Sequence, residues 1–168
     1  AHPLDDGRMV AMRGSLADTA DGLGRDAAGY QRLMEPLVSA GFDLTDRLLS
    51  PRQVPLAHPG HLARFAWSGV RSARALANSR FDTTEAKALF AGLAAHSMLS
   101  LRAPATAAYG LILGVLGHRV GWPMAQGGSQ RIADALVGII EAEGGSIELG
   151  RRVESLSELP STSDVVLD

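Results

Sequence analysis

The sequence predicts a helix-rich α+β fold with a small β-sheet. Apolar residues recur with the period of an α-helix over most of the chain, between about residues 16 and 143, and this spacing is typical of amphipathic helices. A turn signal close to the start separates two short extended segments, which indicates a hairpin. After residue 145 the period changes to two, which indicates strands.

The first fifth of the chain predicts a hairpin followed by two helices. The turn is Asp5-Asp6-Gly7, between His2–Leu4 and Met9–Met12. Ser15 is placed to cap a short helix over 16–23, with Asp18 three residues further on in the position of a capping box and Gly24 at its end.

Asp26 opens the next predicted helix, and an apolar stripe follows along it. We expect Pro36, inside the stripe, to kink or end the helix and Gly41 to interrupt it. Three prolines between Ser50 and Gly60 then predict a loop. The stripe consists of Tyr30, Leu33, Met34, Leu37 and Val38.

Three further helices are predicted over 61–76, 86–97 and 105–117. The second begins after a cap at Thr83 or Thr84 and buries Leu89, Phe90, Leu93 and Ala94. The third has Pro104 in its first turn and is apolar on nearly all sides, so we expect it to be central.

The last quarter predicts one helix and then strands. Gly121-Trp122-Pro123 ends the central helix, and Gly127-Gly128-Ser129 is a turn with Ser129 as the N-cap of a helix that closes at Gly144-Gly145. Extended chain is predicted over 147–156 and again over 164–168.

Composition excludes several classes of protein. The chain has no cysteine, which removes disulfides, thiolate nucleophiles and cysteine-ligated metals. A net charge of -2 argues against nucleic-acid partners. The longest stretch without a charged residue or histidine, 103–117, is too short to span a membrane. No signal sequence is visible, so we expect a cytoplasmic protein, with peripheral membrane contact left open.

Single residues give few chemical signals. His58 and His61 have the spacing of metal ligands but lack further ligands nearby, so we expect no metal site. His96 and His118 have structural interpretations that are simpler than catalysis, as a hydrogen-bonded half-buried residue and as a helix-terminal cation. Serines 97, 100 and 129 lie outside any G-x-S-x-G motif. These residues alone indicate a folded domain and no particular reaction.

One longer pattern is more specific. It joins 121–130 (GWPMAQGGSQ), 132–136 (IADAL), 143–150 (EGGSIELG) and 152–156 (RVESL). The pattern resembles FAD-dependent oxidoreductases of the phytoene desaturase and carotenoid isomerase type. The segments AGLAAHS, ending at Ser97, and AHPLDDGR, at the start of the chain, are similar to the bacterial branch of that group.

The resemblance implies an internal fragment of a larger flavoenzyme. Residues 1–150 would be its helix-rich substrate domain, and 151–168 would be strands that return to a Rossmann-type FAD-binding domain. The dinucleotide fingerprint of that domain is missing here. We therefore expect the isolated chain to be inactive and not to bind FAD tightly, and we expect its partner to be the missing domain.

The resemblance also implies roles for individual residues. Gly127, Gly128 and Val153 would lie near the FAD cofactor. Trp122, Ser129 and His96 would contact an apolar small-molecule substrate, with hydride transfer carried out by the flavin. No catalytic residue is assigned.

Two alternatives remain open. The first is a standalone helical module that binds a partner or an apolar ligand without catalysis, consistent with the abundance of apolar helix surface. The second is a small hydrolase that uses Ser129 with His96 or His118.

Overall fold

The computed structural model describes residues 1–49 and 59–159. The chain divides into two compact units, which we name the helical unit (Ala1–Pro123) and the C-terminal unit (Met124–Asp168). The described elements are mainly helices, with a single two-stranded antiparallel sheet among them. At this coarse level the predicted helix-rich α+β class is confirmed. The predicted domain boundary at residue 150 remains a prediction.

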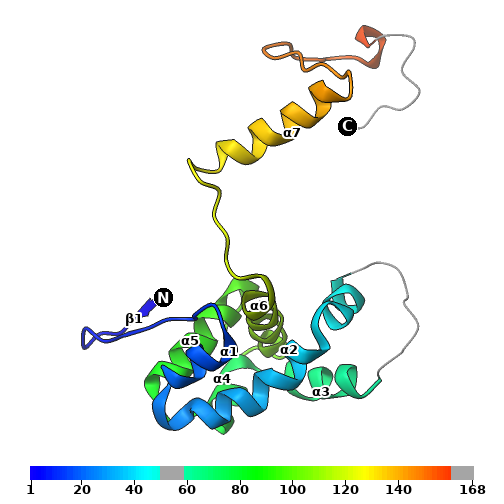
Figure 1. Ribbon diagram of the computed structural model, residues 1–168. Coiled ribbons are helices and arrows are strands. Elements are labelled where there is room, and N and C mark those ends of the chain that lie inside the picture. Colours follow the sequence, from blue (N-terminus) through cyan, green and yellow to red (C-terminus); the bar gives the residue numbers. More distant parts are fainter. Residues whose placement is uncertain (50–58, 160–168) are drawn as a thin grey trace. The chain divides into compact units, whose positions relative to one another are not determined.

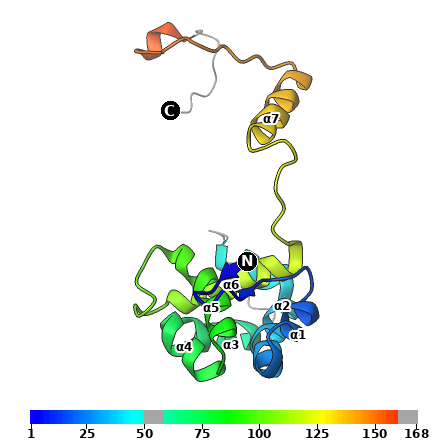
Figure 2. The same cartoon turned by 90° about the vertical axis from the view of Figure 1, so that its left-hand side faces the viewer.

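The helical unit begins with the predicted hairpin. Strand β1 (His2–Pro3) pairs with β2 (Met9–Val10), with His2 opposite Val10. Gly7 closes the turn with a φ of 81° and donates its N–H to the Leu4 carbonyl at 3.0 Å. The hairpin packs against helix α5, described below (Figures 1 and 2).

The first helix begins at the predicted cap but ends earlier than predicted. Helix α1 (Leu16–Asp21) starts where the Ser15 hydroxyl accepts the Asp18 N–H at 3.0 Å, which confirms the predicted cap. It ends at Gly22, before Gly24. A short 3-10 turn, η1 (Gly24–Asp26), then leads into α2 (Ala27–Leu49).

Helix α2 continues through Pro36, contrary to the predicted kink or end. A proline ring has a φ compatible with a helix, although it removes one backbone hydrogen bond and crowds the carbonyl four residues earlier. The non-helical residue is Gly41, with φ 57° and ψ −138°. Only glycine adopts this conformation readily, so the predicted interruption at Gly41 is the one that the structure contains.

Two helices occupy the range predicted as one helix over 61–76. Helix α3 (Pro59–Gly69) ends before Ser72, whose hydroxyl accepts the Ala75 N–H at 3.2 Å and starts α4 (Ala73–Arg80). Pro59, which we predicted in a loop, begins α3, because proline is well suited to a first helical turn. The rest of the predicted loop, residues 50–58, lies outside the described residues.

Helix α5 (Thr84–Ala94) has the predicted Thr83 cap, which accepts the Ala86 N–H at 3.2 Å, and it continues as η2 (Ala95–Ser97). Helix α6 (Thr106–Val120) begins two residues after Pro104, which is therefore outside the first turn. Its N-cap, Ala105, has a φ of 63°. The end of α6 at Gly121 is as predicted.

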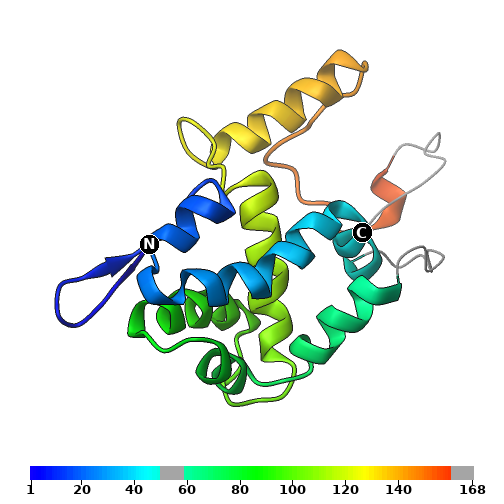
Figure 3. The same ribbon diagram turned by 60° about the horizontal axis from the view of Figure 1, so that its bottom comes forward.

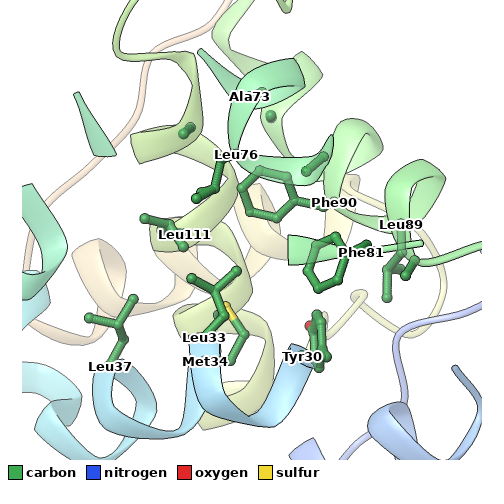
Figure 4. Packing of buried hydrophobic residues seen from close by; sticks show 14 of the residues in the cluster. Tyr30, Leu33, Met34, Leu37, Ala73, Leu76, Phe81, Leu89, Phe90 and Leu111 are labelled. Carbon is green, nitrogen blue, oxygen red and sulfur yellow. The ribbon is translucent and has the colours of Figure 1, made fainter. Parts of the chain in front are cut away.

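Helix α6 is the central element of the helical unit, as its apolar sequence predicts. It packs against α2, α3, α4 and α5 (Figure 3). Its glycines permit close approach: a Cβ at Gly110 would lie 2.9 Å from the Phe90 ring, and one at Gly114 would lie 2.6 Å from the Met34 Cε. The surrounding core is shown in Figure 4 and includes Tyr30, Leu37, Leu76, Phe81, Leu89 and Leu111.

The C-terminal unit contains helix α7 (Gln130–Ala142) and a 3-10 turn, η3 (Leu156–Glu158). Gly144, with φ 81°, follows the end of α7 as predicted. The strands predicted over 147–156 are absent from the described part of this unit. An alternating pattern forms a strand only when a neighbour pairs with its backbone. The strand predicted over 164–168 lies outside the described residues.

Candidate functional site

A pocket of about 330 Å³ lies in the helical unit, beside the hairpin and helix α5. This volume is at the lower end of the range of small-molecule sites, roughly 300–1,000 Å³. Among the described residues, its lining contains no aspartate, glutamate, lysine or arginine side chain. The lining residues come from four parts of the chain: Ala1, His2, Met12, Leu89, Gly92, Leu93, His96 and Trp122.

Two glycines on neighbouring helices set the positions of three lining side chains. The His2 ring occupies the space where a Cβ of Gly92, in α5, would otherwise lie. A Cβ on Gly117, in α6, would lie 2.6 Å from the Trp122 Nε1 and 2.7 Å from the Met12 Sδ. Any larger residue at either glycine must displace these side chains, so the shape of the pocket depends on both positions.

His96 has a defined tautomer in this arrangement. Its Nδ1 lies 3.2 Å from the Gly92 carbonyl oxygen. A carbonyl can only accept a hydrogen bond, so a neutral His96 carries its proton on Nδ1 and leaves Nε2 as an acceptor. Its ring lies 6.1 Å from the Trp122 ring, at an interplanar angle of 31°.

His2 is the second imidazole of the pocket. Burial lowers its pKa, and the positive charges of the N-terminal amine and of His96 lower it further. The imidazole of His2 is therefore mainly neutral at pH 7. Gly92 lies against the His2 ring, and its carbonyl oxygen accepts a hydrogen bond from His96, so both imidazoles lie beside one residue of α5.

The remaining walls are apolar. Leu89 and Leu93 are 1% and 6% exposed and extend the core of the helical unit to the pocket. Met12 adds a flexible thioether, which adapts to ligands of varied shape. The arrangement is suited to an apolar ligand with a polar group near the imidazoles, and it offers no carboxylate for acid–base chemistry.

Two of the predicted site residues, His96 and Trp122, meet in this pocket. Sequence reasoning missed His2 and Met12. The available signal was the pair of glycines inside predicted helices, Gly92 and Gly117, because a glycine within a helix often marks a close approach.

The other predicted site residues belong to the C-terminal unit. Gly127 and Gly128 have φ values of 87° and 95° in the turn before α7. Ser129 directly precedes α7, but its side chain makes no capping hydrogen bond, so that prediction is wrong. Its φ and ψ are helical, whereas a capping serine is usually extended. Val153 lies in a segment without regular structure.

Another polar pair lies away from the pocket. The Tyr30 hydroxyl lies 2.9 Å from the His118 Nε2, and the two rings meet edge to face. Burial raises the pKa of Tyr30 and lowers that of His118. The His118 Nδ1 is buried and makes no hydrogen bond with any residue that the structure describes. With Nε2 engaged by Tyr30, His118 is not placed to activate a serine.

The described residues include no group of three or more side chains able to hold a metal ion. His61 belongs to α3, and His58 lies outside the described residues. Within the same part of the chain, no helix is long and apolar enough to cross a membrane.

Comparisons with protein-family models, with curated proteins and with solved structures found no match to this chain.

Proposed function

We propose that the chain is part of the substrate domain of an FAD-dependent oxidoreductase that acts on an apolar substrate, and that the pocket beside α5 binds that substrate. The observation that carries this proposal is the meeting of His96 and Trp122. Both were assigned to substrate binding from separate segments of the sequence pattern, and both line one pocket with apolar walls.

The residues of this chain fit FAD only in part. The turn has open space beside Gly128, whereas a Cβ at Gly127 would lie 3.3 Å from the Arg131 Nε. Free N–H groups at the start of a helix suit an anionic group, but the Gly128 N–H already donates to the Ala125 carbonyl at 3.1 Å. The sequence has no G-x-G-x-x-G loop for the pyrophosphate. The cofactor would thus be held mainly by another domain, and we derive no chemical step through it.

The direct test is the visible absorption spectrum of the gene product purified from its source. Flavin bands, with FAD released on denaturation, are the expected result. A colourless product would contradict the assignment to a flavoenzyme. Adding FAD to the 168-residue chain provides a second test, because stoichiometric binding with micromolar affinity would show that no further domain is needed.

One observation favours the alternative of a binding module without catalysis. Helix α7 carries an apolar stripe that the C-terminal unit itself leaves exposed: Ile132, Leu136, Ile139 and Ile140 are 44–61% exposed. Exposed apolar stripes of this kind commonly mark interaction surfaces. A colourless gene product of this length that still binds apolar ligands would support this alternative.

A further inference from the structure

We propose that the ligand of this pocket is an apolar alcohol, whose hydroxyl group donates a hydrogen bond to the Nε2 of His96. The inference rests on the proposed substrate pocket and narrows the class of molecule that it takes. Three features carry the argument: the tautomer of His96, the neutrality of His2, and the absence of charged side chains from the lining.

The first feature is a hydrogen-bond acceptor without a partner. The Gly92 carbonyl oxygen lies 3.2 Å from the His96 Nδ1 and accepts its proton in a hydrogen bond, so the Nε2 of the neutral ring presents a lone pair. Nε2 makes no hydrogen bond within the part of the chain that the structure describes. His96 is exposed, so water satisfies this acceptor in the free protein and a hydroxyl group of the ligand replaces that water. A hydrocarbon, an ether or a ketone has no proton to donate.

The second feature distinguishes a hydroxyl from a carboxylate. A carboxylate at this place needs a cationic partner. Burial opposes a positive charge on His2, and so do the N-terminal amine and His96. Among the described lining residues none contributes a lysine or arginine side chain, and the α-amine of Ala1 is the cationic group that remains. His2 therefore favours a neutral polar group, and the carboxylate probe below tests whether the Ala1 amine receives an anionic group instead.

The third feature concerns the rest of the ligand. The two leucines of α5 and Met12 are apolar, as is most of the indole of Trp122, and apart from the two histidines the described lining residues carry no acidic or basic side chain. A ligand with several polar groups would leave some of them unpaired against these walls, at a cost in affinity. One hydroxyl on an apolar body matches the lining.

The test uses the fluorescence of Trp122 in the full chain. The other tryptophan, Trp67, is 78% exposed and does not line the pocket, so Trp67→Phe leaves Trp122 as the reporter. The probes share one body and absorb no light at 295 nm: 4-propylcyclohexanol, its methyl ether, propylcyclohexane and 4-propylcyclohexanecarboxylate. We expect the alcohol to bind about five- to tenfold more tightly than the ether, as one hydrogen bond implies.

Matched variants assign the preference to His96. His96→Asn keeps a donor near the position of Nδ1 and removes the Nε2 acceptor, so it reduces the affinity for the alcohol to that for the ether and leaves the ether unchanged. His61→Asn changes a histidine that does not line the pocket and leaves both affinities as they are. Because His96 is exposed, we expect its variant to fold, and circular dichroism checks this.

The outcomes separate this inference from the proposed function. Equal affinities for alcohol and ether, or tightest binding of the carboxylate, would overturn the inference while leaving the pocket in place. Failure of all four probes to bind would refute the pocket itself. A preference for the alcohol that survives His96→Asn would overturn the role of Nε2, because the hydroxyl would then bond elsewhere.

Discussion

Asp26 shows how much of the helical unit depends on a single side chain. The carboxylate is 4% exposed and accepts the N–H of Asp82 at 2.9 Å, the N–H of Thr83 at 2.7 Å and the Thr83 hydroxyl. It thus joins η1 to the start of α5. Burial alone raises the pKa of Asp26, but the hydrogen bonds from Thr83 and Asp82 outweigh it and hold the pKa below its usual value.

Replacing Asp26 removes the acceptor for these donors. We predict that Asp26→Ala lowers the free energy of unfolding by roughly 2–3 kcal/mol, because hydrogen bonds to a buried charge are lost and two N–H groups are left unpaired. Asp21→Ala, at an exposed aspartate of α1, changes it by less than about 0.5 kcal/mol. Urea unfolding of both variants measures the difference. Equal stabilities would show that water replaces the carboxylate at no cost.

The buried His118 predicts a dependence of stability on pH. Burial lowers its pKa in the folded state, so the unfolded chain binds a proton near pH 6.5 and the folded chain does not. The contribution is thus fully present above pH 6.5 and decreases as the pH falls from 6.5 towards the folded pKa. Urea unfolding between pH 7.5 and 5.0 measures this decrease.

The matched variant is His118→Gln, whose amide lies near the position of Nε2 and keeps a partner for the Tyr30 hydroxyl. We expect a smaller decrease in stability over the same pH range, with the remainder owed to His2, whose pKa is also lowered. An unchanged pH profile would show that His118 does not titrate differently in the folded and unfolded states.

At the scale of elements, the break in α2 depends on one glycine. Gly41 has a φ of 57°, and a Cβ there would lie 3.2 Å from the Arg119 guanidinium. We predict that Gly41→Ala destabilises the chain by about 1–3 kcal/mol, the cost of such a backbone conformation for other residues. Gly60→Ala is the control, because Gly60 lies in α3 with open space around it and has no positive φ. An unchanged free energy of unfolding for Gly41→Ala would mean that residue 41 adopts a helical backbone in the variant.

The sequence correctly predicts those elements that depend on contacts between residues close together in the chain. The caps at Ser15 and Thr83 follow from contacts three residues away, and the hairpin follows from its own turn. The position of the break in α2 was harder to predict. Pro36 and Gly41 both indicate a break in a helix, but only Gly41 has a non-helical backbone. The strands over 147–156 failed because pairing requires a partner strand, which alternation alone does not provide.

The pocket illustrates the same limit for function. His96 and Trp122 were predicted because each belongs to a recognisable segment of sequence. His2 and Met12 join them only through the packing of the hairpin on α5 and through glycines on two helices. Contacts so distant in sequence leave only an indirect local signal, the glycines Gly92 and Gly117 within helices, and this signal does not identify which residues they approach.

At the scale of the whole molecule, the division of the chain after Pro123 predicts that the helical unit folds on its own. Every residue of the hydrophobic core, from Val10 to Val115, lies in the helical unit. The pocket also lies there entirely. In the C-terminal unit, none of the described residues is fully buried.

We therefore predict that residues 1–123 fold alone, with a midpoint of urea unfolding equal to that of the full chain, and that they bind 4-propylcyclohexanol with unchanged affinity. Circular dichroism and Trp122 fluorescence of the shortened Trp67→Phe chain measure the two quantities. A folded fragment that has lost the ligand would assign part of the site to the C-terminal unit, where Gly127, Gly128 and Ser129 lie. An unfolded fragment would contradict this prediction, because the helical unit would then depend on residues after Pro123 for its stability.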